Sequence, residues 1–198
     1  MASEADGCTG MRQIFEELLD GRPVSTGDLI GTVDGGASLN GMLFKVIGEL
    51  IPGKPDHIAI YLGPHGICAE AAPKGVHLFR FFKGRWDSDR MEGQRGIVDK
   101  LYGIRSCLRE GLSSQKGENA ARAVVRDYVL AQMGKPYNLN FAATDQEKAF
   151  YCSQLAWAAY RQAGVDLWPK PGAKRHPLLP KGVITPEDVW RACGEGVR

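Results

Sequence analysis

The sequence predicts an α+β fold, in which helices pack against an antiparallel β-sheet. Short runs of β-forming residues lie between segments whose apolar residues recur at helical spacing, and the two kinds of segment do not alternate strictly. Neither an internal repeat nor a linker divides the chain. Because 198 residues are enough to bury a core, we expect a single domain over residues 1–198.

The first part of the chain predicts a helix, a strand and a second helix. Over residues 11–20, four apolar side chains share one helical face, and Gly21 follows as a C-cap. The run GDLIGTV, residues 27–33, predicts a short strand. Residues 39–51 predict an amphipathic helix that ends at Pro52. We expect its apolar face to cover the core, and an acyl-chain site or a lid is the alternative.

The middle of the chain predicts most of the sheet. HIAIYLG, residues 57–63, is rich in β-forming residues, and after a turn residues 67–79 predict the returning strand or strands. Residues 80–96 predict a loop. We expect its basic and aromatic side chains to be solvated or packed, with contact to an anionic or lipid-like substrate as the alternative. Residues 96–108 then return to the sheet.

The last part of the chain predicts three helices. The first covers residues 118–133, and the second runs from Cys152 to Gly164. After a proline-rich loop, Thr185 is expected to cap a short helix that has Pro186 at its first position.

Composition and charge argue against several classes of protein. A net charge of +2 creates no field that would attract nucleic acid or an anionic membrane. No apolar run approaches the ~20 residues of a transmembrane span, and no signal peptide is visible. The five cysteines are scattered and include no C-x-x-C pair, so neither a disulfide framework nor a zinc site is expected. These features predict a cytoplasmic protein.

Cys152 opens the helical stretch FYCSQLAWAAY, residues 150–160. A nucleophilic cysteine reacts as its thiolate, which a helix N-terminus stabilises through free N–H groups and the positive end of the helix dipole. A small buried residue is the structural alternative, because cysteine is often buried. A catalytic role requires a base, and His57 is the best candidate. His65 and His176 lie in a turn and a loop, and nothing around His77 indicates chemistry.

Glu70 is a candidate for orienting the His57 ring. If the chain folds back at the turn after residue 63, residue 59 pairs with 70 and residue 61 with 68. Glu70 then shares a face with His57 at about 7–8 Å between backbones, a gap that a glutamate side chain can bridge. The contact would stabilise the imidazolium. A one-residue bulge would turn Glu70 away. A strand-edge histidine and a solvated glutamate are the structural alternatives.

Together these motifs resemble the circularly permuted papain-like hydrolases of the NlpC superfamily. Within it they are similar to the YiiX/YaeF-like group, which is related to the lecithin–retinol acyltransferase type. The resemblance rests on GDLI, HIAIYLG with an acidic residue on the next strand, PKGV, GKPYN and FYCSQLAWAAY, in that order. In ordinary papain-like enzymes the cysteine helix comes first, whereas here the histidine and the glutamate precede it, as in the permuted branch.

The resemblance implies a catalytic triad with Cys152 as nucleophile, His57 as base and Glu70 as the orienting third member. It places Tyr137, in GKPYN, near the nucleophile, where it would polarise the thiol or bind the oxyanion. Anchoring a loop is the alternative for Tyr137. Tyr151 has the same alternatives, and we favour the structural one. Relatives often carry glutamate where this chain has Gln154, so a charge-dependent role at that position is in doubt.

The sequence therefore predicts a cysteine hydrolase that cleaves an amide bond in a peptide, isopeptide or N-acyl compound through an acyl-enzyme. No metal and no organic cofactor is expected. One alternative is a thiol-dependent acyltransferase that uses a lipid-like acyl donor. The other is a non-catalytic binding module on the same fold, against which the presence of all three triad residues argues. The expected partner is a small peptide, amide or lipid-like substrate, and not nucleic acid.

Overall fold

The computed structural model describes residues 13–34, 53–110, 115–172, 179 and 181–194. Within these residues, five strands form an antiparallel sheet. In spatial order they are β6 (Gly75–Arg80), β5 (Ile67–Ala72), β4 (His57–Tyr61), β3 (Leu29–Val33) and β7 (Lys100–Arg105). The predicted α+β class and the antiparallel sheet are therefore confirmed.

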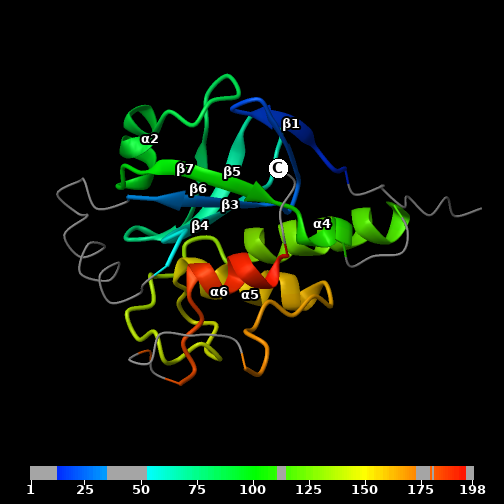
Figure 1. Cartoon of the computed structure of the whole chain (residues 1–198). Helices are drawn as coiled ribbons and strands as arrows, with labels where there is room; N and C mark the ends of the chain where they lie inside the picture. Colours follow the sequence, from blue (N-terminus) through cyan, green and yellow to red (C-terminus); the bar gives the residue numbers. More distant parts are fainter. Residues whose placement is uncertain (1–12, 35–52, 111–114, 173–178, 180, 195–198) are drawn as a thin grey trace, which may run out of the picture.

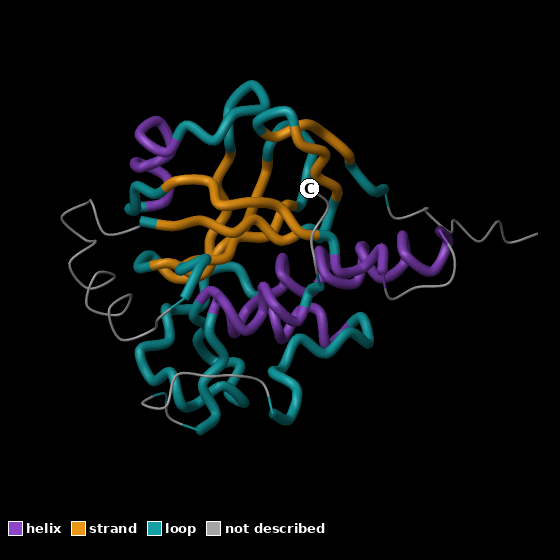
Figure 2. The backbone as a smooth tube through the Cα atoms, viewed as in Figure 1, coloured by secondary structure: helices purple, strands orange, loops and turns teal. Residues whose placement is uncertain are grey.

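The two sides of the sheet are covered differently (Figure 1). The helices on one side are α4 (Gln115–Ala131), α5 (Cys152–Gln162) and α6 (Pro186–Ala192). The other side carries α2 (Ser88–Arg95) and a hairpin of β1 (Glu16–Leu19) and β2 (Arg22–Ser25). A short helix, α3 (Cys107–Glu110), follows β7. Figure 2 shows the same layers, with the helices of the first group side by side below the strands.

Both faces of the sheet are buried, each in its own apolar cluster. Along β4, Ile58 and Ile60 pack with the α5 side, whereas Ala59 and Tyr61 pack on the opposite face with residues of the hairpin and α2. A strand that is covered on both faces has no solvent-exposed side to carry polar residues. This explains why HIAIY is almost entirely apolar and why its histidine stands out.

The helix predicted over residues 11–20 is wrong, because the chain forms the β1–β2 hairpin there. Leu19 pairs with Arg22 across a two-residue turn, and both turn residues have positive φ, 47° at Asp20 and 74° at Gly21. Asp-Gly is a preferred sequence for such a turn, whose twist matches that of the flanking strands. Leu19 is buried while Leu18 is 59% exposed, so the side chains alternate with the period of a strand.

The loop predicted over residues 80–96 is wrong in its second half, where α2 forms. The Asp87 carboxylate accepts a hydrogen bond from the backbone N–H of Arg90, and Gly96 takes the left-handed conformation that ends the helix. The aromatic residues Phe81 and Trp86 belong to the cluster on the α2 side of the sheet. This packing supports the structural interpretation of the segment.

The remaining predicted elements within the described residues are observed. Strands β3 to β7 and helices α4 and α5 lie where the sequence placed them, to within a few residues. The Thr185 side chain accepts from the N–H of Asp188, and the Asp188 carboxylate accepts from the N–H of Thr185, so α6 begins with a capping box. The predicted helix over residues 39–51 lies outside the described residues.

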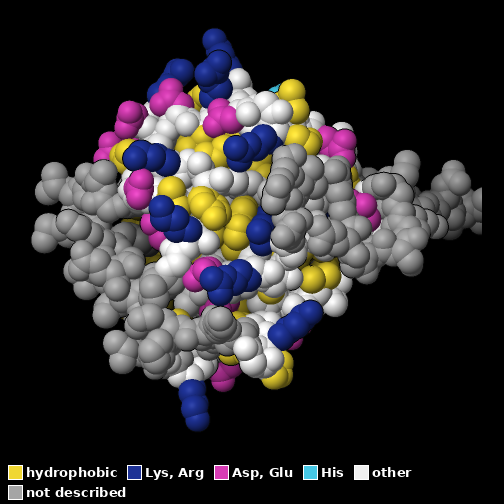
Figure 3. Space-filling model, viewed as in Figure 1, with side chains coloured by type: hydrophobic (Ala, Val, Ile, Leu, Met, Phe, Trp, Pro, Cys, Tyr) yellow, Lys and Arg dark blue, Asp and Glu magenta, His cyan; other side chains and the backbone are white. Residues whose placement is uncertain are grey.

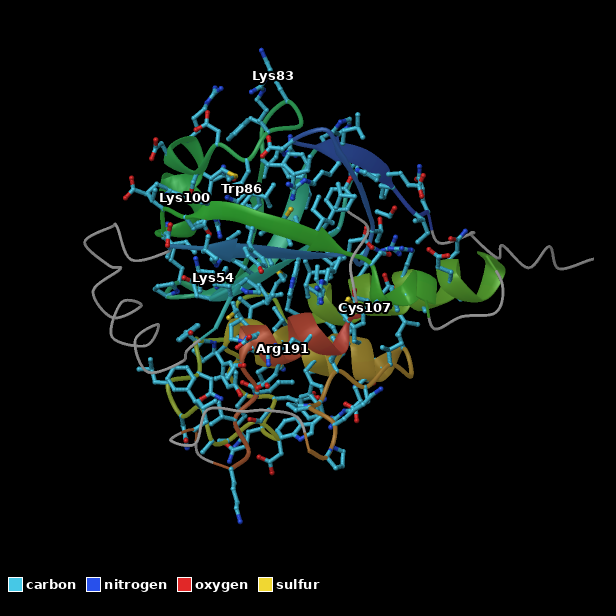
Figure 4. The ribbon with its side chains drawn as sticks, viewed as in Figure 1. Lys54, Lys83, Trp86, Lys100, Cys107 and Arg191 are labelled. Atoms are coloured by element: carbon cyan, nitrogen blue, oxygen red, sulfur yellow. A yellow bond between two sulfur atoms is a disulfide. The ribbon has the colours of Figure 1, made fainter. Side chains whose placement is uncertain are left out.

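A disulfide bond joins Cys107 and Cys193, so the prediction that the cysteines form none is wrong. The two residues are 86 positions apart in the chain, and only the tertiary fold brings the start of α3 to the end of α6. Figure 4 shows Cys107 at the opposite end of β7 from Lys100. The expectation of a cytoplasmic location relied on the absence of such a pair, and it loses that support.

The surface gives little further indication of a partner. On the face seen in Figure 3, basic and acidic side chains are interspersed, with apolar side chains between them. Among the described residues, each helix is too short or too polar to cross a bilayer.

Candidate active site

Cys152 is the first residue of α5, as the sequence predicted. Tyr151 before it is extended, with φ −100° and ψ 168°, and its carbonyl accepts the helical hydrogen bond from the N–H of Leu155. The N–H groups of a first helical turn have no acceptor within the helix, so they can stabilise negative charge at its start. Ser153 fixes this end of the helix by donating its hydroxyl to the carbonyl of Ile184 at 2.9 Å.

The predicted pairing of β4 with β5 is observed, and it brings His57 to Glu70. Tyr61 faces Cys68 in the register that the sequence predicted. His57 Nε2 lies 2.8 Å from Glu70 Oε2, and the side chains are 2% and 0% exposed. A buried hydrogen bond of this length fixes the orientation of the imidazole ring and leaves Nδ1 as the second ring nitrogen available for proton exchange.

His57 also interacts with Cys152. Burial would lower the pKa of His57, but the charge of Cys152 and a hydrogen bond with its side chain act in the opposite direction. Glu70 adds a hydrogen bond and its own charge, and the pKa of His57 rises to about 10. The fold therefore brings together the three residues that the resemblance singled out, although they stand at positions 57, 70 and 152 of the chain.

Glu70 is held in turn by Arg95, the last residue of α2. The guanidinium donates to both carboxylate oxygens, from Nε to Oε1 at 2.9 Å and from Nη2 to Oε2 at 2.7 Å. Burial would raise the pKa of Glu70, but the Arg95 charge and the contacts with His57 and His77 hold it well below its usual range. These neighbours favour the ionised form of a carboxylate whose side chain is 0% exposed.

The opposite edge of the Arg95 guanidinium is bound by Asp99, with two contacts of 2.8 Å. The rings of Phe79 and Trp86 lie on it, with centroids 4.6 Å and 4.8 Å from Cζ. Asp99 also accepts hydrogen bonds from the Thr32 hydroxyl, the Trp86 indole and the Ser88 hydroxyl. A buried chain of hydrogen-bonded groups therefore runs from His57 through Glu70 and Arg95 to Asp99.

The two tyrosines of the predicted site occupy different environments. Burial, and then the charge of Cys152, raise the pKa of Tyr137, so the two side chains interact electrostatically. The Tyr151 hydroxyl contacts the Thr144 hydroxyl at 2.9 Å and the carbonyl of Phe141 at 3.2 Å, and it accepts from the N–H of Ile184. The Tyr151 hydroxyl thus fastens two loops to the start of α5.

Gln154 holds the loop that follows Tyr137. Its amide nitrogen donates to the carbonyls of Thr144 and Gln146, at 3.0 Å and 2.9 Å. Its amide oxygen accepts from the side chain of Asn138 at 3.0 Å. A carboxylate could not donate to these carbonyls. The glutamine that departs from the pattern of the relatives is therefore matched to the loop around it.

Three residues near His57 and Glu70 were not identified from the sequence: Arg95, Asp99 and His77. His77 Nε2 lies 3.3 Å from Glu70 Oε1, because the strand pair β5–β6 places the two residues opposite each other. The helix that ends at Arg95 could have been found from Asp87 as its N-cap and Gly96 after its end. Nothing in the local sequence indicates which carboxylates the arginine would meet.

The comparison with known families matched one segment of the chain. Residues 110–175, a segment that includes Tyr137 and Cys152, match the family described as permuted papain-like amidase enzyme, YaeF/YiiX, C92 family. No curated protein and no solved structure matched the chain. The predicted resemblance to the permuted papain-like amidases, which are cysteine peptidases by class, is thus confirmed over residues 110–175.

Proposed function

We propose that this protein is an amidase whose nucleophile is Cys152, with His57 as general base and acid and Glu70 as the residue that orients it. The observation that supports the proposal most strongly is the position of His57, which bonds Glu70 at 2.8 Å and also interacts with Cys152. A nucleophile, a base and an orienting group in hydrogen-bond contact form the arrangement that covalent catalysis requires.

The proposed reaction has two stages. The Cys152 thiolate attacks the carbonyl carbon of an amide, and the imidazolium of His57 gives its proton to the leaving nitrogen as the C–N bond breaks. The product of this stage is a thioester on Cys152 and a free amine. His57 then takes a proton from water, whose oxygen attacks the thioester carbonyl, and the carboxylic acid leaves as the thiolate re-forms. Glu70 keeps the ring oriented throughout.

The negative oxygen of each tetrahedral intermediate requires hydrogen-bond donors. The backbone N–H of Cys152, at the start of α5, is one such donor. We propose the Tyr137 hydroxyl as the second, because the charge of Cys152 acts on it. We assign Tyr151 a structural role, since its hydroxyl already serves Thr144, Phe141 and Ile184.

The proposal is tested by activity profiling against peptide amides, isopeptides, N-acyl amides and esters. We expect amide hydrolysis by the wild type and a loss of at least about 10³-fold in kcat/KM in Cys152→Ala, since removal of a nucleophile leaves only binding and oxyanion stabilisation. Cys68→Ala is the matched control, because Cys68 is a buried free cysteine of β5 outside the proposed machinery. Equal activity of Cys152→Ala and the wild type would refute the proposal.

Product analysis with a labelled acyl donor distinguishes hydrolysis from acyl transfer. With water alone as acceptor, an amidase releases the labelled acid at its full rate. If release of the label required an added amine or alcohol, the protein would be an acyltransferase that uses the same thioester.

A further inference from the structure

Arg95 occupies a position in which it can control the proposed site without contacting a substrate. Its Nε and Nη2 atoms both reach the Glu70 carboxylate, at distances from 2.7 to 3.1 Å. Two parallel N–H donors fix the plane of a carboxylate as well as its position. Glu70 Oε2 is consequently directed at His57 Nε2, and the Glu70 carboxylate has no freedom to rotate without breaking a charged hydrogen bond.

The guanidinium itself is held on every side. Asp99 binds its far edge through Nη1 and Nη2, and Phe79 and Trp86 lie against it. The Arg95 side chain is 0% exposed. A lysine cannot reproduce this geometry, because an ammonium is a point charge that makes no planar two-point contact. The surroundings therefore select arginine for its shape as well as for its charge.

Arg95 also decides between two histidines that share Glu70. His57 lies 2.8 Å from Oε2, and His77 lies 3.3 Å from Oε1. The Arg95 guanidinium donates to both of these oxygens, which fixes the carboxylate with Oε2 towards His57. If the guanidinium were absent, the Glu70 carboxylate could rotate towards His77, and burial would favour its protonated form. Either change would remove the negative charge that faces the His57 ring.

The charges around His57 come from several elements of the fold. The titratable and charged groups that act on it or on Glu70 are Cys152 of α5, Glu70 of β5, His77 of β6, Arg95 of α2, and Asp56 and Asp99 in the segments before β4 and β7. Arg95 is the permanent cation among them. Its positive charge offsets Glu70 and Asp99, and it allows both carboxylates to stay ionised in a buried site.

We propose that Arg95 is a positioning residue that acts through Glu70 to hold the His57 ring in the orientation in which it exchanges a proton with Cys152. The inference rests on the proposed function of Cys152 and His57. It assigns Arg95 no contact with substrate. It predicts that the reactivity of Cys152, and not only the stability of the fold, depends on a residue of α2.

The test measures the rate at which iodoacetamide alkylates Cys152 as a function of pH, read by peptide mass spectrometry and needing no substrate. We expect the wild type to react at pH 6 at least about tenfold faster than His57→Ala, because an oriented imidazole takes up the thiol proton. In Arg95→Met the rate at pH 6 should fall by about tenfold, because a protonated or rotated Glu70 no longer orients the ring. Arg95→Lys, which retains the charge, should show a smaller loss.

A control and a double variant separate positioning from general destabilisation. Arg122→Met removes another buried arginine, which bonds Asp28 and Glu118 instead, and its alkylation rate should equal that of the wild type. In a Glu70→Gln background, Arg95→Lys should cause no further loss of rate, because its effect passes through Glu70. If Arg95→Met does not fold, Arg95→Lys decides the question.

The outcomes distinguish the inference from the function on which it rests. If His57→Ala slows alkylation but the Arg95 variants do not, or if Arg122→Met slows it equally, the inference alone is overturned. If the rate is unaffected by His57→Ala, the proposed catalytic pair is refuted, and the inference fails with it.

Discussion

Arg95 and Arg122 are both buried and both paired with two carboxylates, yet their surroundings differ in kind. Arg95 bonds Glu70 and Asp99, and one of these carboxylates contacts His57. Arg122, on α4, bonds Asp28 at 2.7 Å and Glu118 at 2.9 Å, and it donates to the Ser106 hydroxyl and the carbonyl of Thr26. The Arg122 cluster connects α4 to the segment before β3 and to the residue after β7, and it includes no histidine.

The comparison shows that a buried ion pair can either stabilise the fold or act on a neighbouring group that takes up and releases protons. Asp99 and Asp28 illustrate the difference, since each lies against an arginine. At Asp99, burial would raise the pKa, but Arg95 together with His57 and Thr32 lowers it from 3.8. At Asp28, burial outweighs Arg122, and the pKa is raised from 3.8. The same pair of residue types therefore shifts the pKa of aspartate in opposite directions in the two clusters.

The largest expected effect is a loss of stability in Arg122→Met without a change in the reactivity of Cys152. Arg122→Met should lower the free energy of unfolding by about 3–5 kcal/mol, because it leaves Asp28 buried without its cation. Chemical denaturation measures this loss. The alkylation rate of Cys152, corrected for the folded fraction, should stay at the wild-type value. A change in that rate would show that the Arg122 cluster reaches the active site after all.

As the pH falls, the contributions of Asp28 and Asp99 to folding stability should change in opposite directions. The pKa of Asp28 is raised, so the folded state binds its proton first, and the stability cost of this group is relieved as the pH falls towards 3.8. The pKa of Asp99 is lowered, so its contribution is present above 3.8 and is lost as the pH falls through the folded value.

The measurement uses two matched variants, Asp28→Asn and Asp99→Asn, with Tm recorded from pH 7 to pH 3. The Tm of the wild type relative to Asp28→Asn should increase towards acid. Relative to Asp99→Asn it should decrease below about pH 4. If the Tm differences from the wild type varied with pH in the same way for both variants, the two clusters would not differ in their response to acid.

The smallest expected effect comes from a pair of serines. Ser88 donates to Asp99 at 3.0 Å, and Ser106 accepts from Arg122 at 2.6 Å. Ser88→Ala and Ser106→Ala should each cost about 1–2 kcal/mol of stability, because each removes a buried hydrogen bond to a charged group. Neither should change the alkylation rate of Cys152 at pH 6, since the Glu70–Arg95 contact remains in both. A slower rate in Ser88→Ala would extend the functional cluster beyond Asp99.

The sequence was sufficient for the parts of the site that depend on local periodicity. The contact between His57 and Glu70 follows from one turn and one strand register, and the position of Cys152 follows from a helix boundary. The same reasoning failed over residues 11–20, where apolar residues at helical spacing outweighed the Asp-Gly turn signal.

Arg95 and the Cys107–Cys193 bond could not be predicted in this way, for a shared physical reason. Each is a pairing between residues that lie far apart in the chain, and the choice of partner depends on tertiary packing. A buried arginine looks the same as a solvated one in a single sequence. Scattered cysteines likewise give no indication of which two will meet.

The Cys107–Cys193 bond has a practical consequence for work with this protein. Enzymes that act through a thiol are commonly assayed with dithiothreitol, which keeps the reactive sulfur from oxidising. Here the same reagent would also reduce the disulfide bond between α3 and the end of α6. Losing a native disulfide often lowers the free energy of unfolding by about 2–5 kcal/mol. We therefore expect turnover to rise and then fall as reductant is added. The same reagent that keeps the Cys152 thiol reduced would destabilise the fold by reducing the disulfide bond.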